Sequence, residues 1–226
     1  MSMSKFVSRL KGESFIIDSA IPSFYLFRFF ITKGLSMLYG MIRLLTFTRV
    51  FIHPSSTIVC SSKFRFGKNL SVGRGCYIDA LSIDGLSTGY NVSIGKFSCI
   101  ECTGSLKKMG KGICIGNNVG LGTHGYFGGA GGVSIGDDCI FGNYVSIHPE
   151  NHIFSKLDIP IRLQGTSQKG ITIGNNCWIG AKAMFLDGSS IGNGCIVAAG
   201  AIVTKNFPDN CIIGGIPAHI IKYRQL

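Results

Sequence analysis

The chain has 226 residues, of which 46% are hydrophobic, and its 32 glycines fall in no low-complexity tract. This length is sufficient for a large core, and the density of glycine favours a β fold with many turns. The formal net charge is +11, but no basic run alternates with aromatic residues, which argues against nucleic-acid binding. The nine cysteines are scattered and odd in number, which is typical of free thiols that fill apolar space in a reducing compartment. The single CxxC motif (Cys99 to Cys102) has no second pair, so zinc binding or redox chemistry is not expected.

Residues 1–50 differ from the rest, because they carry seven basic residues against two acidic ones. Within them, residues 23–47 are rich in Phe and Leu and predict one or two helices. Basic residues interrupt this stretch, and its longest uncharged run, residues 34–42, is shorter than the about 20 residues of a membrane span. No signal peptide is evident, so we expect a cytoplasmic protein. A helical cap on the next domain is expected here, with peripheral contact to the inner face of the membrane as the alternative.

A six-residue period begins near residue 60 and becomes regular in the last third of the chain. Its uninterrupted part places an aliphatic or aromatic residue at one phase in six successive units: Ile173, Ile179, Phe185, Ile191, Val197 and Val203. Neither a helix nor an ordinary strand has this period. It is typical of a parallel β-solenoid in which three short strands complete a triangular coil of about 18 residues. Cys177 and Cys195 are 18 residues apart and should stack on neighbouring coils.

Three stretches interrupt the period upstream: Asp79–Asn91, Glu101–Gly112 and Pro149–Gly170. We expect them to be loops that leave the coil, because extruded loops on a regular scaffold are where binding and catalytic residues concentrate. The third loop has His152 near its root, with Glu150 beside it. Imidazole accepts a proton near neutral pH, so His152 is a candidate general base acting on a hydroxyl or an amine.

Three segments together resemble the hexapeptide-repeat acyltransferases: residues 151–180, 199–205 and 215–218. The resemblance covers about residues 60–226. It is to the galactoside, maltose and nodulation acetyltransferase group, and most of all to the polysaccharide acetyltransferases. It implies an all-β fold, a left-handed parallel β-helix of hexapeptide repeats with extruded loops, which is an exception to the right-handed crossover rule. The expected domains are a short helical extension (1–50) and a β-helix acyltransferase domain with a basic tail (51–226).

The same resemblance implies transfer of an acetyl group from acetyl-CoA, without a metal, to a sugar hydroxyl of a surface polysaccharide or glycoconjugate. It also implies a homotrimer with an active site in each cleft. In that family a single histidine at the loop root deprotonates the acceptor, and His152 matches its place. Family members of the galactoside type read Gly-His-Pro where this chain reads Asn151-His152-Ile-Phe, so the acceptor stays open. Asn151 and His124 are candidate acceptor contacts. Glu150 either orients the imidazole or is an exposed loop carboxylate.

The resemblance also assigns residues to the cofactor. Those expected to contact acetyl-CoA are Trp178, Gly180, Ala181, Ala199, Thr204, Lys205 and Arg224. Backbone N–H groups near Gly180 and Ala181 would hold the thioester oxygen, because the charge that develops there needs preorganised donors. The alternative for Lys205 and Arg224 is solvated surface charge, and for Trp178 a place in the core.

Other function classes stay open. One is N-acetylation of a nucleotide-linked amino sugar, and a second is a solenoid that only binds. The gamma-type carbonic anhydrases use the same solenoid with three histidines on zinc. The spacing of His124, His148 and His152 does not resemble theirs, so a metal site is not expected.

Overall fold

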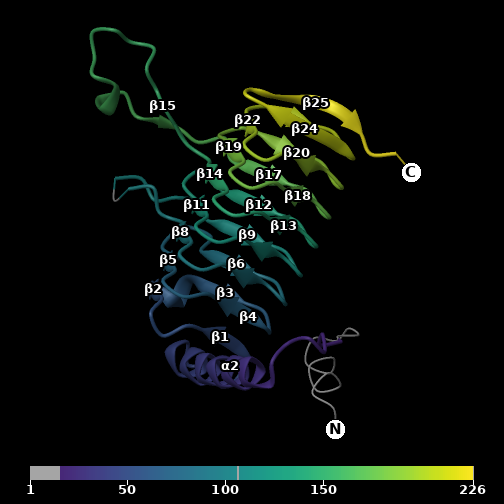
Figure 1. Cartoon of the computed structure of the whole chain (residues 1–226). Helices are drawn as coiled ribbons and strands as arrows, with labels where there is room; N and C mark the ends of the chain where they lie inside the picture. The colour runs from purple at the N-terminus through teal and green to yellow at the C-terminus, as the bar shows by residue number, and fades with distance from the viewer. Residues whose placement is uncertain (1–15, 106, 226) are drawn as a thin grey trace.

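The structure, a computed structural model, describes residues 16–105 and 107–225. One helix lies across the base of a coil of short strands, and the strands stack into three sheets along the coil (Figure 1). We call them sheets A, B and C. Each coil of the chain contributes one strand to each sheet in turn, and the seven strands of sheet B therefore mark seven complete coils.

Sheet A has nine strands: β1 (Val50–Ile52), β4 (Leu70–Val72), β7 (Ser93–Ile94), β10 (Gly120–Leu121), β13 (Ile140–Phe141), β18 (Trp178–Ile179), β21 (Ile196–Val197), β24 (Cys211–Gly215) and β25 (Ala218–Tyr223). Sheet B has seven: β2 (Thr57–Val59), β5 (Tyr77–Asp79), β8 (Cys99–Glu101), β11 (Tyr126–Gly128), β14 (Ser146–His148), β19 (Met184–Leu186) and β22 (Ile202–Val203). Sheet C has seven: β3 (Phe64–Phe66), β6 (Leu86–Thr88), β9 (Ile113–Ile115), β12 (Val133–Ile135), β17 (Ile171–Ile173), β20 (Ser190–Ile191) and β23 (Asn206–Phe207). All neighbours pair in parallel except β24 and β25, which are antiparallel.

The inward side chains confirm the six-residue period. Each member of its uninterrupted part is at most 2% exposed: Ile173, Ile179, Phe185, Ile191, Val197 and Val203. Trp178 pairs with Ile196, one coil of 18 residues later, as predicted. Because successive side chains of a strand point to opposite faces, each short strand places one or two aliphatic side chains in the core and turns the rest outward.

Asparagine and aspartate side chains join the coils at the corner between sheets C and A. The Oδ1 atoms of Asp137, Asn175, Asn193 and Asp209 each accept the backbone N–H of the equivalent residue one coil earlier, at 2.6–2.8 Å. The next residue in these turns has a positive φ, which Asn tolerates better than most side chains, as at Asn176 (φ 55°). The Asn-rich turns of the sequence are thus structural.

The cysteines are part of the core. Cys139, Cys177, Cys195 and Cys211 form a buried column where the chain enters sheet A, and each is at most 2% exposed. The predicted stacking of Cys177 on Cys195 is confirmed, and all nine cysteines are free. Small thiols fill the space that Val92 and Val119 fill in earlier coils.

Two of the three predicted loops are confirmed, and the first is wrong in extent. Within Asp79–Asn91, strand β6 joins sheet C with Leu86 fully buried, and Asp79 belongs to β5, so only residues 80–85 leave the coil. In the sequence Leu-Ser-Thr no aliphatic residue is followed by a glycine, as one is in many of the other repeats. The six-residue period alone therefore does not predict strand β6. Residues 102–112 and 149–170 do leave the coil.

All of these excursions leave at one corner, between sheets B and C, and the two long ones project from the same side of the coil (Figure 1). Residues 149–170, here called the arm, contain the antiparallel strands β15 (Asn151–His152) and β16 (Thr166–Ser167) and the short 3-10 helix η2 (Ile161–Leu163). A second short 3-10 helix, η1 (Ser61–Lys63), lies in the first coil.

A single helix, α2 (Ser23–Arg43), fills the stretch for which one or two were predicted. It packs on β1, where Gly40 allows close approach: a Cβ atom there would lie 3.1 Å from the backbone of Val50 and Ile52. The Arg43 guanidinium donates to the carbonyl of Ile58 at 2.7 Å. The helix thus packs on the first strand of the coil, and the division at residue 50 stays a prediction.

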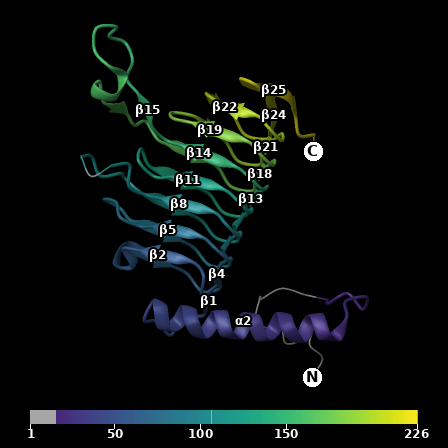
Figure 2. The same ribbon diagram turned by 60° about the vertical axis from the view of Figure 1, so that its left-hand side comes forward.

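The first half of α2 extends past the coil that it covers (Figure 2). Its large side chains are exposed there, with Phe24 at 74% and Phe27 at 62%. No helix within residues 16–105 and 107–225 is long and apolar enough to cross a membrane. The basic residues before residue 16 lie outside the described part of the chain.

Candidate active site at the corner between sheets B and C

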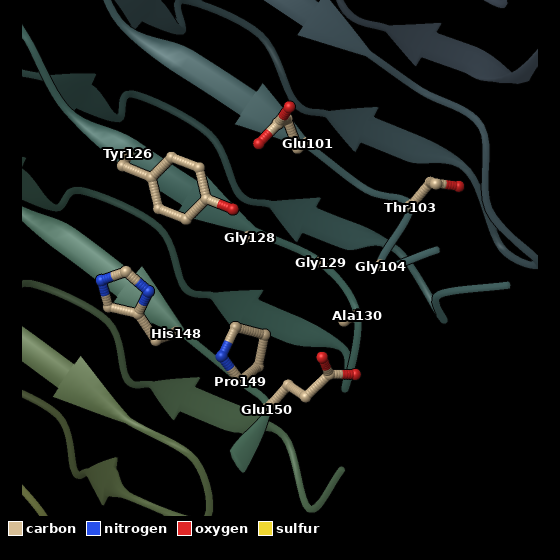
Figure 3. Close-up of a pocket in the computed structure, with 10 residues that line it drawn as sticks. All are labelled: Glu101, Thr103, Gly104, Tyr126, Gly128, Gly129, Ala130, His148, Pro149 and Glu150. Carbon is tan, nitrogen blue, oxygen red and sulfur yellow. The ribbon is translucent and has the colours of Figure 1, made fainter. Parts of the chain in front are cut away.

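A pocket of about 240 Å³ lies at the corner where the loops leave the coil (Figure 3). Three successive coils form it, with strands β8, β11 and β14 supplying the walls. Its lining consists of Glu101, Thr103, Gly104, Tyr126, Gly128, Gly129, Ala130, His148, Pro149 and Glu150. The pocket therefore lies between the 102–112 loop and the root of the arm.

The middle coil makes room for this pocket because it turns the corner without large side chains. Residues 128–132 read Gly-Gly-Ala-Gly-Gly. A Cβ atom on Gly129 would lie 2.8 Å from the Cα of Cys102, and one on Gly131 would lie 2.0 Å from the carbonyl oxygen of Pro149. Real Cβ atoms do not approach so closely, so these glycines let the two loop roots close on the corner from either side.

His148 and Tyr126 form one wall. They occupy neighbouring strands of sheet B, and their rings stack with centroids 5.2 Å apart. Burial lowers the pKa of His148 from its ordinary value, so the imidazole is neutral at pH 7 and can accept a proton or a hydrogen bond. Burial, together with the nearby Glu101 carboxylate, raises the pKa of Tyr126 to about 12, and the phenol remains a donor to Glu101.

Two carboxylates face the pocket from opposite sides, Glu101 from β8 and Glu150 from the root of the arm (Figure 3). The side-chain amide of Gln168, which follows the returning strand β16, donates to Glu150 Oε2 at 2.5 Å. This bond fixes the Glu150 carboxylate across the root of the arm. The pocket thus presents several hydrogen-bond acceptors to a ligand that carries hydroxyl or ammonium groups.

His152, the predicted base, lies two residues beyond Glu150 in β15 and is exposed. It pairs with Thr166, as Asn151 pairs with Ser167, and the carbonyl of Gly165 accepts the N–H of Ile153 at 3.0 Å. The hairpin therefore holds the backbone of His152 at the arm root while its imidazole remains accessible. Asn151 is also exposed in the same strand.

The residues predicted to contact the cofactor lie at three places in one chain. Trp178, which is 57% exposed, and the turns with Ala181 and Ala199 lie on sheet A and at its corner with sheet B. Trp178 is thus not in the core. The Gly180 N–H donates to the Val197 carbonyl at 2.7 Å, so it is not available to hold a thioester oxygen. Of the two proposed oxyanion donors, Ala181 N–H remains.

Thr204 and Lys205 lie at the corner between sheets B and C in the last complete coil, and the Lys205 ammonium lies 5.6 Å from the centre of the Phe207 ring. Arg224 follows β25, and its guanidinium donates to the Gly194 carbonyl at 2.8 Å, at the corner between C and A. One chain does not gather all the predicted cofactor residues around one cavity.

His124 lies at the corner between sheets A and B with φ of 57°. Its ring stacks between those of Phe97 and Tyr144, with centroids 5.2 and 4.8 Å away. These three side chains are exposed and point out from the same corner of three successive coils. His124 therefore does not line the pocket of its own chain.

Glu101, Tyr126 and His148 were not predicted as site residues. They come from three coils whose alignment depends on strand register across the inserted loops. The one available signal was the Gly-rich stretch 128–132, which marks a corner stripped of side chains. Within residues 16–105 and 107–225, no three His, Cys, Asp or Glu side chains converge as metal ligands would.

Comparisons with known proteins agree with this architecture. Residues 170–205 match the family described as bacterial transferase hexapeptide (six repeats). A protein of Mycobacterium tuberculosis named "Probable acetyltransferase" is 32% identical over 69% of this chain and 50% of its own. The Escherichia coli protein named "Putative lipopolysaccharide biosynthesis O-acetyl transferase WbbJ" is 30% identical over 52% of this chain and 64% of its own. Escherichia coli galactoside O-acetyltransferase is 35% identical over 40% and 43%. The chain thus spans about half the length of the curated relatives it matches.

Among solved structures, AntD, an N-acyltransferase from Bacillus cereus in complex with dTDP and coenzyme A, superimposes with a TM-score of 0.57. The identity is 20%, and the match covers 78% of this chain and 82% of the other. The fold is a left-handed parallel β-helix with extruded loops and a short N-terminal helix. The chain thus resembles the hexapeptide-repeat transferases in sequence over residues 170–205, and it shares their fold over 78% of its length.

Proposed function

We propose that the protein is an acetyltransferase that moves an acetyl group from acetyl-CoA to a sugar hydroxyl of a surface polysaccharide or glycoconjugate. The observation that carries this proposal is the accessible His152 in β15, on an arm whose first residues, Pro149 and Glu150, line a pocket with several hydrogen-bond acceptors. The sugar O-acetyltransferases among the relatives support the acceptor class. AntD was solved with coenzyme A, which supports the cosubstrate.

In the proposed reaction His152 takes the proton of the acceptor hydroxyl as its oxygen attacks the thioester carbon. The carbon–sulfur bond then breaks, and the leaving thiolate of coenzyme A takes the proton from the His152 imidazolium. Glu101 and Glu150 accept hydrogen bonds from neighbouring hydroxyls of the acceptor, and the Ala181 N–H is the remaining donor for the thioester oxygen. Glu150 is held by Gln168 rather than by His152, so we assign it to the acceptor.

The distribution of the cofactor residues supports a site shared between protomers. Ala181 and Ala199 lie at one edge of sheet B, whereas the arm, Thr204 and Lys205 lie at the other. In a homotrimer these two edges of neighbouring chains can meet, which would bring His124 of one chain toward the pocket of the next. We propose this arrangement, with acetyl-CoA along the cleft.

The test is an assay of acetyl-CoA with free sugars, nucleotide-linked amino sugars and surface polysaccharide fragments. With the best acceptor, His152→Ala should lower kcat by about 10²- to 10⁴-fold and leave KM for acetyl-CoA nearly unchanged, because a general base acts in the transition state. No transfer to any acceptor would reject the enzyme class.

His148→Asn is the matched comparison, since burial lowers the pKa of the His148 imidazole and this residue directly precedes the arm. We expect a smaller loss of kcat and a raised KM for the acceptor, because the ring forms the pocket wall. Near-normal turnover in His152→Ala together with a large loss in His148→Asn would move the base to His148.

The pair of carboxylates supports a second candidate acceptor, the amine of a nucleotide-linked amino sugar. An ammonium group would be attracted to Glu101 and Glu150 and would need to lose a proton before attack. The acceptor panel decides between them. Transfer to the amino sugar with none to hydroxyl acceptors would replace the O-acetyl proposal.

We also propose that the protein works at the inner surface of the membrane, through residues 1–50. Support comes from the exposed aromatic side chains of the overhanging half of α2, such as Phe24 and Phe27, and from Arg28 among them. Such a helix lies in the lipid interface rather than across it. Phe24→Ser with Phe27→Ser should reduce co-flotation with vesicles of anionic phospholipid. Unchanged vesicle binding in both this variant and Arg28→Glu would reject the contact.

A further inference from the structure

The outer face of sheet C is a groove whose floor carries only small side chains. Six successive strands each contribute one outward residue in register: Ser87, Cys114, Ser134, Thr172, Ser190 and Asn206. The groove has a volume of about 680 Å³. Since neighbouring strands lie about 4.8 Å apart, the floor extends about 24 Å along the coil. It is long, flat and lined mainly by hydroxyl and amide groups.

Two lysines stand along the edge of this floor at the corner between sheets B and C. Lys111 and Lys169 occupy equivalent positions two coils apart, which separates their backbones by about 9.6 Å. The stem of Lys111 lies over Gly132 and that of Lys169 over Gly188, where an added Cβ would lie 3.3 and 2.9 Å from the lysine Cδ atoms. Both are exposed, and neither ammonium has a hydrogen bond or an ion pair within the described chain.

The far end of the groove adds Arg65 on β3, whose guanidinium donates to the backbone carbonyl of Asp84 at 2.8 Å. Asp84 is the only acidic residue among those that line the groove in the described chain, against three basic ones. The groove thus has a positive charge, which suits an anionic ligand.

The floor also distinguishes between classes of anionic polymer. Among the described residues no aromatic side chain lines it, so the bases of a single-stranded nucleic acid would find no ring there on which to stack. The hydroxyl groups of Ser87, Ser134, Thr172 and Ser190 and the amide of Asn206 can instead hydrogen-bond to the hydroxyls and carboxylates of a sugar chain. We propose that the outer face of sheet C binds an extended anionic polysaccharide, with Lys111 and Lys169 contacting its acidic groups.

The groove and the pocket share one corner. Gly131 and Gly132 line the groove, while Gly129 and Ala130 line the pocket. A chain bound along sheet C could therefore present one sugar over this bare corner to the pocket. This last step rests on the proposed transferase function, whereas the binding itself does not.

The test measures equilibrium binding without acetyl-CoA, using oligogalacturonate as the probe, with dextran of equal length and a single-stranded oligodeoxynucleotide for comparison. The full-length protein should prefer oligogalacturonate, and its affinity should fall with salt. Lys111→Ala with Lys169→Ala should weaken binding about tenfold, as expected for two exposed ion pairs. Lys68→Ala with Lys222→Ala, which removes two exposed lysines outside the groove, should have little effect.

A second variant pair tests the floor without changing charge. Ser134→Trp places a bulky side chain in the middle of the groove and should weaken oligogalacturonate binding, while Ser134→Thr should not. Sedimentation mass is measured for each variant. A change of mass in Ser134→Trp would overturn the proposal, because it would show that sheet C is an interface between protomers. Equal binding of the oligonucleotide, or unchanged affinity in both groove variants, would also overturn it.

Transfer to a free monosaccharide or short acceptor in the same variants separates this inference from the proposed function. Loss of polymer binding with normal transfer to the small acceptor supports the groove. Transferase activity by a protein that binds no oligogalacturonate would reject the groove and leave the transferase proposal standing.

Discussion

Small residues and chain register together decide the chemistry at the corner between sheets B and C. His152 and Glu150 could be predicted from the sequence because both lie within one loop, and the interrupted six-residue period marks that loop. Glu101, Tyr126 and His148 could not, because they approach one another only after strands separated by about one coil pair in parallel across loops of different length. Gly180 shows the converse, since a backbone N–H matching an oxyanion donor is used by the next coil.

The lowered pKa of His148 predicts how stability depends on pH. Its folded pKa lies below the ordinary 6.5, so the unfolded chain binds a proton first as the pH falls. Stability is therefore fully present above about pH 6.5 and decreases below it, until the folded pKa is reached. Tm measured from pH 8 to pH 5 should fall less steeply for His148→Asn than for the wild type. Parallel curves would show that His148 makes no such contribution.

The separation of Lys205 and Arg224 gives a second prediction for single residues. If both contact phosphates of acetyl-CoA, Lys205→Ala and Arg224→Ala should each weaken its binding about two- to fivefold at low salt. The effects should be additive, because the two side chains lie at different corners. Calorimetry at low and high salt checks this, and the loss should shrink as salt rises. Unchanged affinity at low salt would leave both as surface charges.

At the scale of elements, the hexapeptide period predicted the strands of the last third well because every inward position there is aliphatic or aromatic. The prediction from the period is wrong at β6, because Thr88 stands where an aliphatic residue usually precedes glycine. The period therefore predicts a loop where the structure has a strand. The arm was expected as a loop, but its antiparallel strands were not. They form because residues 151 and 152 meet residues 166 and 167 across the long connection 153–165, and no short-range pattern marks such a pairing.

Asp187 anchors the returning end of the arm. It is 8% exposed, and its Oδ1 accepts the N–H groups of Lys169 and Gly170 at 2.7 and 2.9 Å. Asp187→Ala would leave two N–H groups without this acceptor, so we expect a loss of about 2–4 kcal/mol in the free energy of unfolding. Asp158→Ala, in the exposed part of the arm, should change it by less than about 0.5 kcal/mol. Denaturant unfolding measures both.

Limited proteolysis adds a readout specific to the arm. Asp187→Ala should be cut faster within residues 153–165 at a denaturant concentration where the rest of the coil stays folded. Equal cleavage rates in Asp187→Ala and the wild type would show that Asp187 stabilises the coil alone.

For the whole molecule, we predict a homotrimer with three shared clefts, because one chain separates the arm from half of the expected cofactor contacts. Sedimentation equilibrium should give about three times the chain mass of 24.2 kDa. Mixing His152→Ala chains with Ala199→Trp chains, whose cofactor edge is blocked, should restore part of the activity in mixed trimers. A fully active monomer would refute the shared site, and no restoration in proven mixed trimers would place both halves in one chain.

The three loops that interrupt the coil all leave it at one corner, so their lengths can change without changing the fold of the coil. Paired residues of neighbouring parallel strands in sheet A are as few as 16 positions apart in the sequence, for Ile196 and Ile212, and as many as 38, for Ile140 and Trp178, yet both pairs remain in register. Doubling the length of such a loop costs only about 0.6 kcal/mol. Because these loops lie outside the core, lengthening or shortening them can change which acceptor the protein binds. Related chains can therefore differ in substrate while they keep the same coil.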